Sequence, residues 1–279
     1  MSKVMVPTPR RRPFGDLGLA KAVKSAVDEI VELYQSDRIP WVIGYSGGKD
    51  STATLQLVWL ALQTLPAAEL TKPVHVISTD TLVENPVVSA WVNRSLQVMG
   101  AKAAEQGLPL QPHKLTPELA DTFFWVNLIG KGYPAPRPRF RWCTERLKIK
   151  PSNSFIRSMV RAHGEAILVL GMRKQESSTR ARVMTAHEAK RVRERLAPNS
   201  GLPNSLVYTP IESWSSDEVW MFLMQVENPW GYSNKDLLTM YQARRQTTSA
   251  RWSSTPPLLA AATAASAAGP APWSMKTSP

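Results

Sequence analysis

Residues 41–52 read Trp41-Val-Ile-Gly-Tyr-Ser-Gly-Gly-Lys-Asp-Ser-Thr52: an apolar run, a turn of small residues and the start of a helical pattern. Gly47 and Gly48 carry no Cβ, so the backbone can adopt positive φ there and approach a ligand closely. The amides at the start of the following helix lack intrahelical partners and favour an anion. The stretch therefore predicts a phosphate-binding loop between a strand and a helix.

The spacing of this loop differs from that of two common phosphate loops. A Walker A loop needs a glycine where Ile43 stands and a Ser or Thr where Asp50 stands, and residues 41–52 contain no Gly-x-Gly-x-x-Gly. An ordinary solvated turn is the alternative. We favour phosphate binding because strand, loop and helix follow in the required order.

The chain has 279 residues, a formal net charge of +12 and a pI near 10.0, a balance that favours nucleic acid or other anionic partners. Its single cysteine excludes an intramolecular disulfide. Residues 1–15 read as a basic arm without the apolar core of a secretory signal. No segment reaches the roughly 18 apolar residues of a membrane span, so we expect a cytoplasmic protein.

Alternating strand and helix patterns predict the fold class. Apolar residues at three- and four-residue steps predict a helix over 17–34, with Asp16 as its cap. Strands are expected at 41–45, 74–78, about 109–115, 166–170 and 206–208. We therefore predict one domain over 16–241: an α/β, doubly wound, mostly parallel sheet with helices on both faces. Ligands of such sheets lie beyond the carboxyl ends of the strands, at the topological switch.

Two further groups of polar residues follow predicted strands. Asp80 and Thr81 end the second strand, where a carboxylate suits Mg²⁺ or a ribose hydroxyl, although ordinary turn chemistry is the alternative. The fourth strand is followed by residues that we expect to clamp and orient phosphates, unless they form an ordinary charged surface. These residues are Arg173, Glu176, Ser177 and Arg180.

The stretch 136–151 is strongly cationic. Its positive charges suit an anionic substrate or a nucleic-acid backbone, whereas a solvated surface is the alternative. Cations favour the thiolate form of Cys143, as a sulfur carrier or metal ligand requires, and a small buried residue is the alternative there. The cations are Arg137, Arg139, Arg141, Arg146, Lys148 and Lys150.

Together these segments resemble the adenosine phosphosulfate and phosphoadenosine phosphosulfate reductase superfamily of PP-loop ATP pyrophosphatases. The resemblance runs from about Val42 to Tyr241. It covers SGGKDS at 46–51, Asp80-Thr81, RWCTxxLKxxP at 141–151, GxRxxES at 171–177 and PIxxWxxxEVW at 210–220. Within the superfamily, three segments look most similar to the DndC-type sulfurtransferases of DNA phosphorothioation. They are PAPRPRFRWCTERLKIKPSN at 134–153, GMRKQESSTRA at 171–181 and NPWGY at 228–232.

The resemblance implies a function and cofactors. Such enzymes use ATP, cleaved between its α and β phosphates, to activate a DNA phosphate for sulfur insertion, and they work beside a cysteine desulfurase and other Dnd proteins. Cys143 would be a ligand of a 4Fe-4S cluster. Pyrophosphate would be held by Ser46, Gly47, Gly48, Lys49, Asp50 and Ser51, next to Thr52.

The expected chemistry is attack of a phosphate oxygen on the α-phosphorus of ATP. Lys49 and the loop amides would stabilise the developing charge, with Mg²⁺ near Asp50 or Asp80. We assign catalysis to Lys49, Asp50, Cys143 and Arg173.

The C-terminal residues depart from the family pattern. Residues 242–279 contain no Asp, Glu or Cys and include an alanine-dense run at 260–268. This composition predicts a low-complexity, disordered tail. One choice of codons, read in a shifted frame, gives a peptide with Cys-x-x-Cys, so we expect that a frameshift removed the remaining cluster ligands. The chain would then be truncated, impaired in sulfur transfer and unable to assemble the cluster.

Two other functions stay open. A phosphoadenosine phosphosulfate reductase-like enzyme of sulfur assimilation would need a redox-active cysteine near the C-terminus. A non-catalytic nucleic-acid-binding protein would use the basic surface alone.

Overall fold

The computed structural model describes residues 13–136, 142–178, 181–182, 184–185 and 195–253. The described residues form two units, one up to Asn234 and one from Lys235 onward. Among the described residues, none of the helices has the length and the apolar run that a membrane crossing demands.

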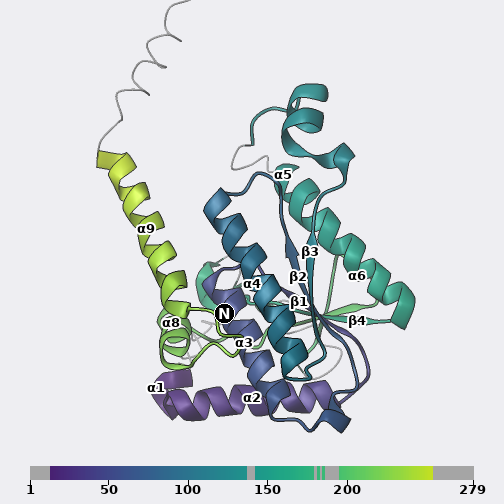
Figure 1. The fold of residues 1–279 in the computed structure, drawn as a ribbon, viewed down its shortest axis with the longest axis vertical. Helices are drawn as coiled ribbons and strands as arrows, with labels where there is room; N and C mark the ends of the chain where they lie inside the picture. Colours follow the sequence, from purple (N-terminus) through teal and green to yellow (C-terminus); the bar gives the residue numbers. More distant parts are fainter. Residues whose placement is uncertain (1–12, 137–141, 179–180, 183, 186–194, 254–279) are drawn as a thin grey trace, which may run out of the picture. The chain divides into compact units, whose positions relative to one another are not determined.

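The first unit alternates helices and strands (Figure 1). Its first half contains α1 (Pro13–Leu17), α2 (Leu19–Gln35), β1 (Trp41–Gly44), α3 (Lys49–Gln63), η1 (Ala67–Glu69), β2 (Val74–Thr79), α4 (Pro86–Glu105) and β3 (Leu110–Leu115). After β3 come η2 (Leu119–Asp121), η3 (Phe123–Gly130), α5 (Trp142–Thr144), η4 (Glu145–Ile149), α6 (Lys150–His163), β4 (Ala166–Val169), η5 (Lys174–Glu176), β5 (Ala197–Pro198), β6 (Ser205–Tyr208) and α8 (Ser216–Gln225).

The described strands form one six-stranded sheet in the order β3-β2-β1-β4-β6-β5. All neighbouring strands are parallel except β5 and β6. The order runs outward from β1 to β3 on one side and from β4 to β6 on the other, so the topological switch lies between β1 and β4. The prediction of a doubly wound, mostly parallel α/β sheet is confirmed.

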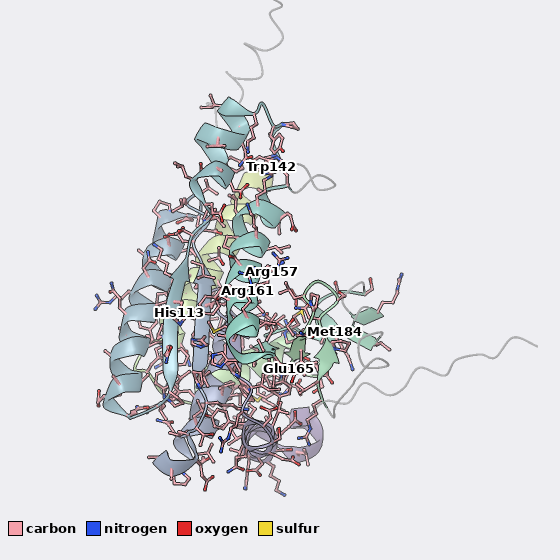
Figure 2. The ribbon with its side chains drawn as sticks, turned by 90° about the vertical axis from the view of Figure 1, so that its right-hand side faces the viewer. His113, Trp142, Arg157, Arg161, Glu165 and Met184 are labelled. Atoms are coloured by element: carbon pink, nitrogen blue, oxygen red, sulfur yellow. The ribbon has the colours of Figure 1, made fainter. Side chains whose placement is uncertain are left out.

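Helices cover both faces of the sheet, and Figure 2 shows α4 and α6 on opposite sides of the strands. Side chains alternate between the faces along a strand. Val42 therefore packs with Ile77 and with Ile156 of α6. The neighbouring Trp41 instead contacts the rings of Tyr34 on α2 and Tyr208 on β6. Both faces of β1 are buried, which explains its continuous apolar run.

Three details differ from the sequence predictions. Asp16 lies inside α1 and does not cap the next helix, because Gly18, with φ of 74°, separates α1 from α2 and supplies no side-chain cap. The two-residue strand β5 was missed because its pairing with β6 leaves no local periodicity. In the second unit, α9 (Asn234–Ser253) continues past the expected boundary at 242, since no Pro or Gly interrupts this stretch. Residues 254–279, with the alanine-dense run, lie outside the described residues.

A histidine pair lies between the sheet and α6. His75 Nδ1 of β2 is 3.0 Å from His113 Nε2 of β3, and both rings contact Phe155 of α6. Burial, and secondarily the charges of His113 and His163, lower the pKa of His75 to about 4. Burial also lowers the pKa of His113.

This pair predicts loss of stability in mild acid. The pKa of His75 is lower in the folded chain than the ordinary 6.5, so folding favours the neutral ring; its stabilisation is present above about pH 6.5 and is lost as the pH falls toward 4. At about 1.36 kcal/mol per pKa unit, His75 contributes up to about 3 kcal/mol of this loss. Urea unfolding at pH 7.5 and pH 5 measures it, and His75→Gln should flatten the difference. An unchanged pH dependence in that variant would contradict the assignment.

Candidate phosphate site

The expected phosphate loop lies at the topological switch. Ser46, Gly47 and Gly48 connect β1 to the first turn of α3, and the residues that follow β4 lie beside them. The backbone amides at the start of α3 have no intrahelical partners, as at any helix N-terminus. The sequence-derived loop and the position that this fold class reserves for ligands therefore coincide.

The two glycines of the loop differ in conformation. Gly47 has φ of +68°, whereas Gly48 has φ of −88° and an extended backbone, so the expectation of positive φ holds for Gly47 alone. A Cβ on Gly47 would lie 2.6 Å from Val92 Cγ2 and 3.5 Å from Trp91 Cδ1. Glycine is therefore required here both by the backbone angle and by the close approach of α4.

Two serines hold the loop in shape. The Ser51 hydroxyl lies 3.1 Å from the Ser46 hydroxyl and donates to the Gly48 carbonyl at 3.0 Å, and the Ser46 amide points at Ser51 Oγ at 3.2 Å. Thr52 is 3% exposed and lies in the packed first turn of α3. Ser51 thus holds the loop through hydrogen bonds, and Thr52 is buried, so its role at the nucleotide stays a prediction.

The charged residues of the loop form an ion-pair cluster with Arg173. Lys49 Nζ lies 2.9 and 2.8 Å from the two carboxylate oxygens of Asp50. Arg173 Nε donates to Asp50 Oδ1 at 2.6 Å, and its Nη1 donates to the Trp214 carbonyl at 3.4 Å. The Arg173 side chain is only 4% exposed. The described contacts of Arg173 are thus with the Asp50 carboxylate and a backbone carbonyl, and its role as a phosphate clamp stays a prediction.

Gly171 brings the segment after β4 against the loop. A Cβ at this position would lie 2.6 Å from the carbonyl oxygen of Asp50 and 2.9 Å from the amide nitrogen of Ser51. Both neighbours are backbone atoms that cannot move aside without displacing the loop. The glycine of the GxRxxES segment is thus explained by contact with the loop.

Asp80 lies at the carboxyl end of β2, as predicted, and its carboxylate has ion-pair and hydrogen-bond partners within the chain. Lys114 of β3 pairs with it at 2.9 Å, the Leu82 amide donates at 2.9 Å and the Ser89 hydroxyl at 3.3 Å. Partial burial opposes ionisation, but the Lys114 ammonium and the Leu82 amide outweigh it and lower the pKa of Asp80. The neighbouring Thr81 is buried. Asp80 is therefore a carboxylate throughout the neutral range.

The described cations of the cationic stretch each form ion pairs within the chain. Arg146 pairs with Asp121 at 2.9 Å, Lys148 pairs with Glu84 at 2.8 Å, and Lys150 pairs with Asp121 and Glu118. The Lys150 and Arg146 contacts lower the pKa of Asp121 despite its burial. These three cations thus have partners within the chain, and their binding to an anionic substrate stays a prediction. Arg137, Arg139 and Arg141 lie outside the described residues.

Cys143 and the residues after Arg173 lie on other elements. Cys143 is a free, partly exposed thiol in α5, which Figure 1 shows beyond the ends of β2 and β3. Glu176 and Ser177 are exposed at the end of η5, and Arg180 lies outside the described residues. Sequence reasoning missed Lys114, whose place at the end of a predicted strand was a usable signal, and Trp91, for which no local signal exists.

The two implied metal centres fit differently. Mg²⁺ is usually held by one or two carboxylates together with substrate phosphates. Among the described residues, no three His, Cys, Asp or Glu side chains are placed so that they could hold a metal ion together. Asp50 and Asp80 therefore fit only as single ligands that act with phosphates. A 4Fe-4S cluster needs about four thiolates, and Cys143 is the single cysteine of the sequence. The chain's residues do not fit that cluster.

The sheet topology and the loop at its switch define a PP-loop α/β protein. Residues 40–230 match the model of the phosphoadenosine phosphosulfate reductase domain, and the chain belongs to this family. The match includes the loop, Asp80, the Cys143 segment and Arg173.

The sequence identity to individual relatives is low. An uncharacterized protein of Methanocaldococcus jannaschii is 28% identical over 207 residues, which are 74% of this chain and 36% of that protein. The chain therefore spans about a third of this relative's length.

Solved structures resemble the fold at low identity. A U34-tRNA thiolase of Methanococcus maripaludis with its 4Fe-4S cluster is 14% identical at a TM-score of 0.45, over 82% of this chain and 74% of that one. An NAD⁺ synthetase of Burkholderia pseudomallei is 12% identical at 0.46, over 78% and 81%. A phosphoadenylyl-sulfate reductase of Candida auris in a phosphate complex is 12% identical at 0.40, over 75% and 85%. The fold assignment rests on the sheet topology and the family match.

Proposed function

We propose that this chain is a PP-loop enzyme that cleaves ATP between its α and β phosphates to activate a phosphate group for sulfur transfer. The observation that supports this most is the loop at the topological switch, where Lys49 and Arg173 both contact Asp50 in the first turn of α3. A helix N-terminus and a nearby ammonium suit the pyrophosphate of a nucleotide.

In the proposed reaction, an oxygen of the acceptor phosphate forms a bond to the α-phosphorus of ATP. The bond between that phosphorus and the α,β-bridging oxygen breaks, and pyrophosphate leaves with the electron pair. Lys49 and the α3 amides stabilise charge on the departing pyrophosphate. Asp50 or Asp80 would hold Mg²⁺, which supplies further neutralisation of the phosphates.

The acceptor that we propose is a DNA backbone phosphate, to be thiolated beside a cysteine desulfurase and other Dnd proteins in the cytoplasm. A net charge of +12 supports a polyanionic substrate. In the second step a sulfide-level nucleophile would form a bond to the acceptor phosphorus, the bond from that phosphorus to the oxygen that bridges it to AMP would break, and AMP would leave with the electron pair. No step is assigned to an iron-sulfur cluster, because the single cysteine does not fit one.

The family match also supports a second candidate, reduction of a phosphosulfate. Both candidates bind an adenine nucleotide at the loop, but only the sulfurtransferase cleaves ATP. A non-catalytic nucleic-acid-binding protein would do neither. The discriminating observable is therefore release of AMP and pyrophosphate from ATP.

The test incubates the full chain with Mg²⁺, α-labelled ATP, duplex DNA and sulfide as the sulfur nucleophile, and separates the nucleotides. We expect DNA-dependent formation of AMP and pyrophosphate, lowered at least about 100-fold in Lys49→Met, as for loss of a group that stabilises transition-state charge. Lys24→Met, at an exposed position of α2, is the matched control. Absence of ATP cleavage together with tight binding of phosphoadenosine phosphosulfate would favour the reductase instead.

A further inference from the structure

Asp50 is held between two cations. Its Oδ1 lies 2.9 Å from Lys49 Nζ and 2.6 Å from Arg173 Nε. We propose that Arg173 is a positioning residue that neutralises Asp50, so that Asp50 can fix Lys49 at the loop without cancelling the positive charge that Lys49 offers to a phosphate. This inference rests on the proposed function in one respect, namely that the loop binds the phosphates of a nucleotide.

The charge balance of the cluster gives the physical reason. One carboxylate with two cations leaves a net charge of +1 beside the α3 amides. If Arg173 were absent, Lys49 and Asp50 would form a neutral pair, and an approaching phosphate would have to compete with Asp50 for the ammonium. If Asp50 were absent, the long Lys49 side chain would lose the contact that fixes its position. The three residues therefore act as a unit.

Burial assigns different roles to the two cations. The Arg173 side chain is 4% exposed, whereas those of Lys49 and Asp50 are 12% and 20% exposed. The guanidinium thus lies on the protein side of the carboxylate, with Nη1 directed at the Trp214 carbonyl. Lys49 lies nearer the surface, where a ligand approaches. This arrangement suits a supporting Arg and a ligand-contacting Lys.

The backbone fixes Arg173 in this place. Gly171 lies against the Asp50 carbonyl, at a distance that a Cβ would not allow. The Lys174 amide donates to the Glu212 carbonyl at 2.9 Å, which ties the segment after β4 to the segment after β6. The position of Arg173 is therefore determined by neighbouring strands and does not depend on a bound ligand.

The test is binding of inorganic pyrophosphate by titration calorimetry, at low salt with EDTA so that no Mg²⁺ contributes. The proteins are the wild-type chain, Arg173→Gln, Arg173→Lys, Asp50→Asn and the double variant Asp50→Asn/Arg173→Gln. We expect Arg173→Gln to weaken binding at least about tenfold, because the cluster becomes neutral. In the double variant the net charge returns to +1 but Lys49 loses the Asp50 contact, so binding should recover only in part, to at least about threefold tighter than Arg173→Gln, a non-additive result that a double-mutant cycle detects.

A matched control separates the local effect from the overall charge. Arg157→Gln removes one positive charge from an exposed position of α6, a residue labelled in Figure 2, and should leave pyrophosphate binding unchanged. If Arg173→Gln does not fold, Arg173→Lys gives the answer: it keeps the charge and should bind within about threefold of wild type.

The outcomes distinguish failure of phosphate binding by the loop from failure of the positioning role of Arg173. A wild-type chain that binds no pyrophosphate overturns both the phosphate loop and this inference. A wild-type chain that binds, combined with a folded double variant that stays as weak as Arg173→Gln, overturns only the role of Arg173. A folded Arg173→Lys that loses binding does the same. Recovery in the double variant supports the positioning role, since a residue needed only for packing would not be rescued by removing a carboxylate.

Discussion

Gly171→Ala is expected to lower the affinity for ATP about 100-fold, because displacing a binding group by about 1 Å has effects of this size. The new Cβ would lie 2.6 Å from the Asp50 carbonyl oxygen, 2.7 Å from its carbonyl carbon and 2.9 Å from the Ser51 amide nitrogen. These atoms belong to the loop backbone, so relief of the contact requires movement of the loop itself. Overpacking of this kind also lowers the free energy of unfolding by about 1–3 kcal/mol.

Titration calorimetry with ATP and urea unfolding measure the two effects. Gly100→Ala is the control, because a Cβ at that position of α4 meets only Pro112, at 3.8 and 3.9 Å. This control should bind ATP normally and gain up to about 1 kcal/mol of stability from helix propensity. Equal ATP affinities of Gly171→Ala and wild type would show that the segment after β4 does not support the loop.

Gly47→Ala is expected to have the second largest effect. Its φ of +68° lies in the left-handed region, and its Cβ would lie 2.6 Å from Val92 Cγ2. The backbone strain costs about 1–2 kcal/mol. The contact with Val92 adds to this cost and would displace the loop away from α4. We expect at least a tenfold loss of ATP affinity, by the same displacement argument that gives about 100-fold for 1 Å.

A second glycine isolates the contact from the strain. Gly107 has φ of +65°, but a Cβ there would meet nothing within 4 Å. Gly107→Ala should therefore lose only the strain energy, measured by urea unfolding, and should bind ATP as the wild type does. If the two variants were equally stable and bound ATP equally well, the contact of the new Cβ at position 47 with Val92 would have no effect on stability or ATP binding.

The sheet was predictable because its signals are local. The apolar run that begins at Trp41 and the small residues that follow it specify a strand, a turn and a helix within twelve positions. The parallel strands β2, β4 and β6 also contain apolar runs, whereas β3 is mostly polar. The antiparallel strand β5 could not be found in this way, because two residues carry no period. The cap of α2 was misassigned since a short helix, α1, precedes it.

The site was predictable in its position and less so in its contacts. Ser46, Asp80 and Arg173 all follow strands, and the carboxyl ends of parallel strands share one edge of a sheet. Their partners come from distant parts of the chain: Lys114 for Asp80 and Trp214 for Arg173. Contacts of this kind depend on which helices and strands pack together, and they cannot be predicted from local sequence patterns.

Backbone chemistry along residues 41–52 is sufficient to specify the strand, the loop and the helix start, because φ restrictions, amide polarity and hydrophobic periodicity act over a few residues. The ion pairs of Arg173, Arg146 and Lys150 were found only in the tertiary structure. An arginine with the same sequence neighbours serves as a phosphate clamp when exposed and as a support when buried beside a carboxylate. Burial and charge pairing arise between segments more than a hundred residues apart, such as Asp50 and Arg173, |i−j| = 123, and they decide which of these roles the side chain takes.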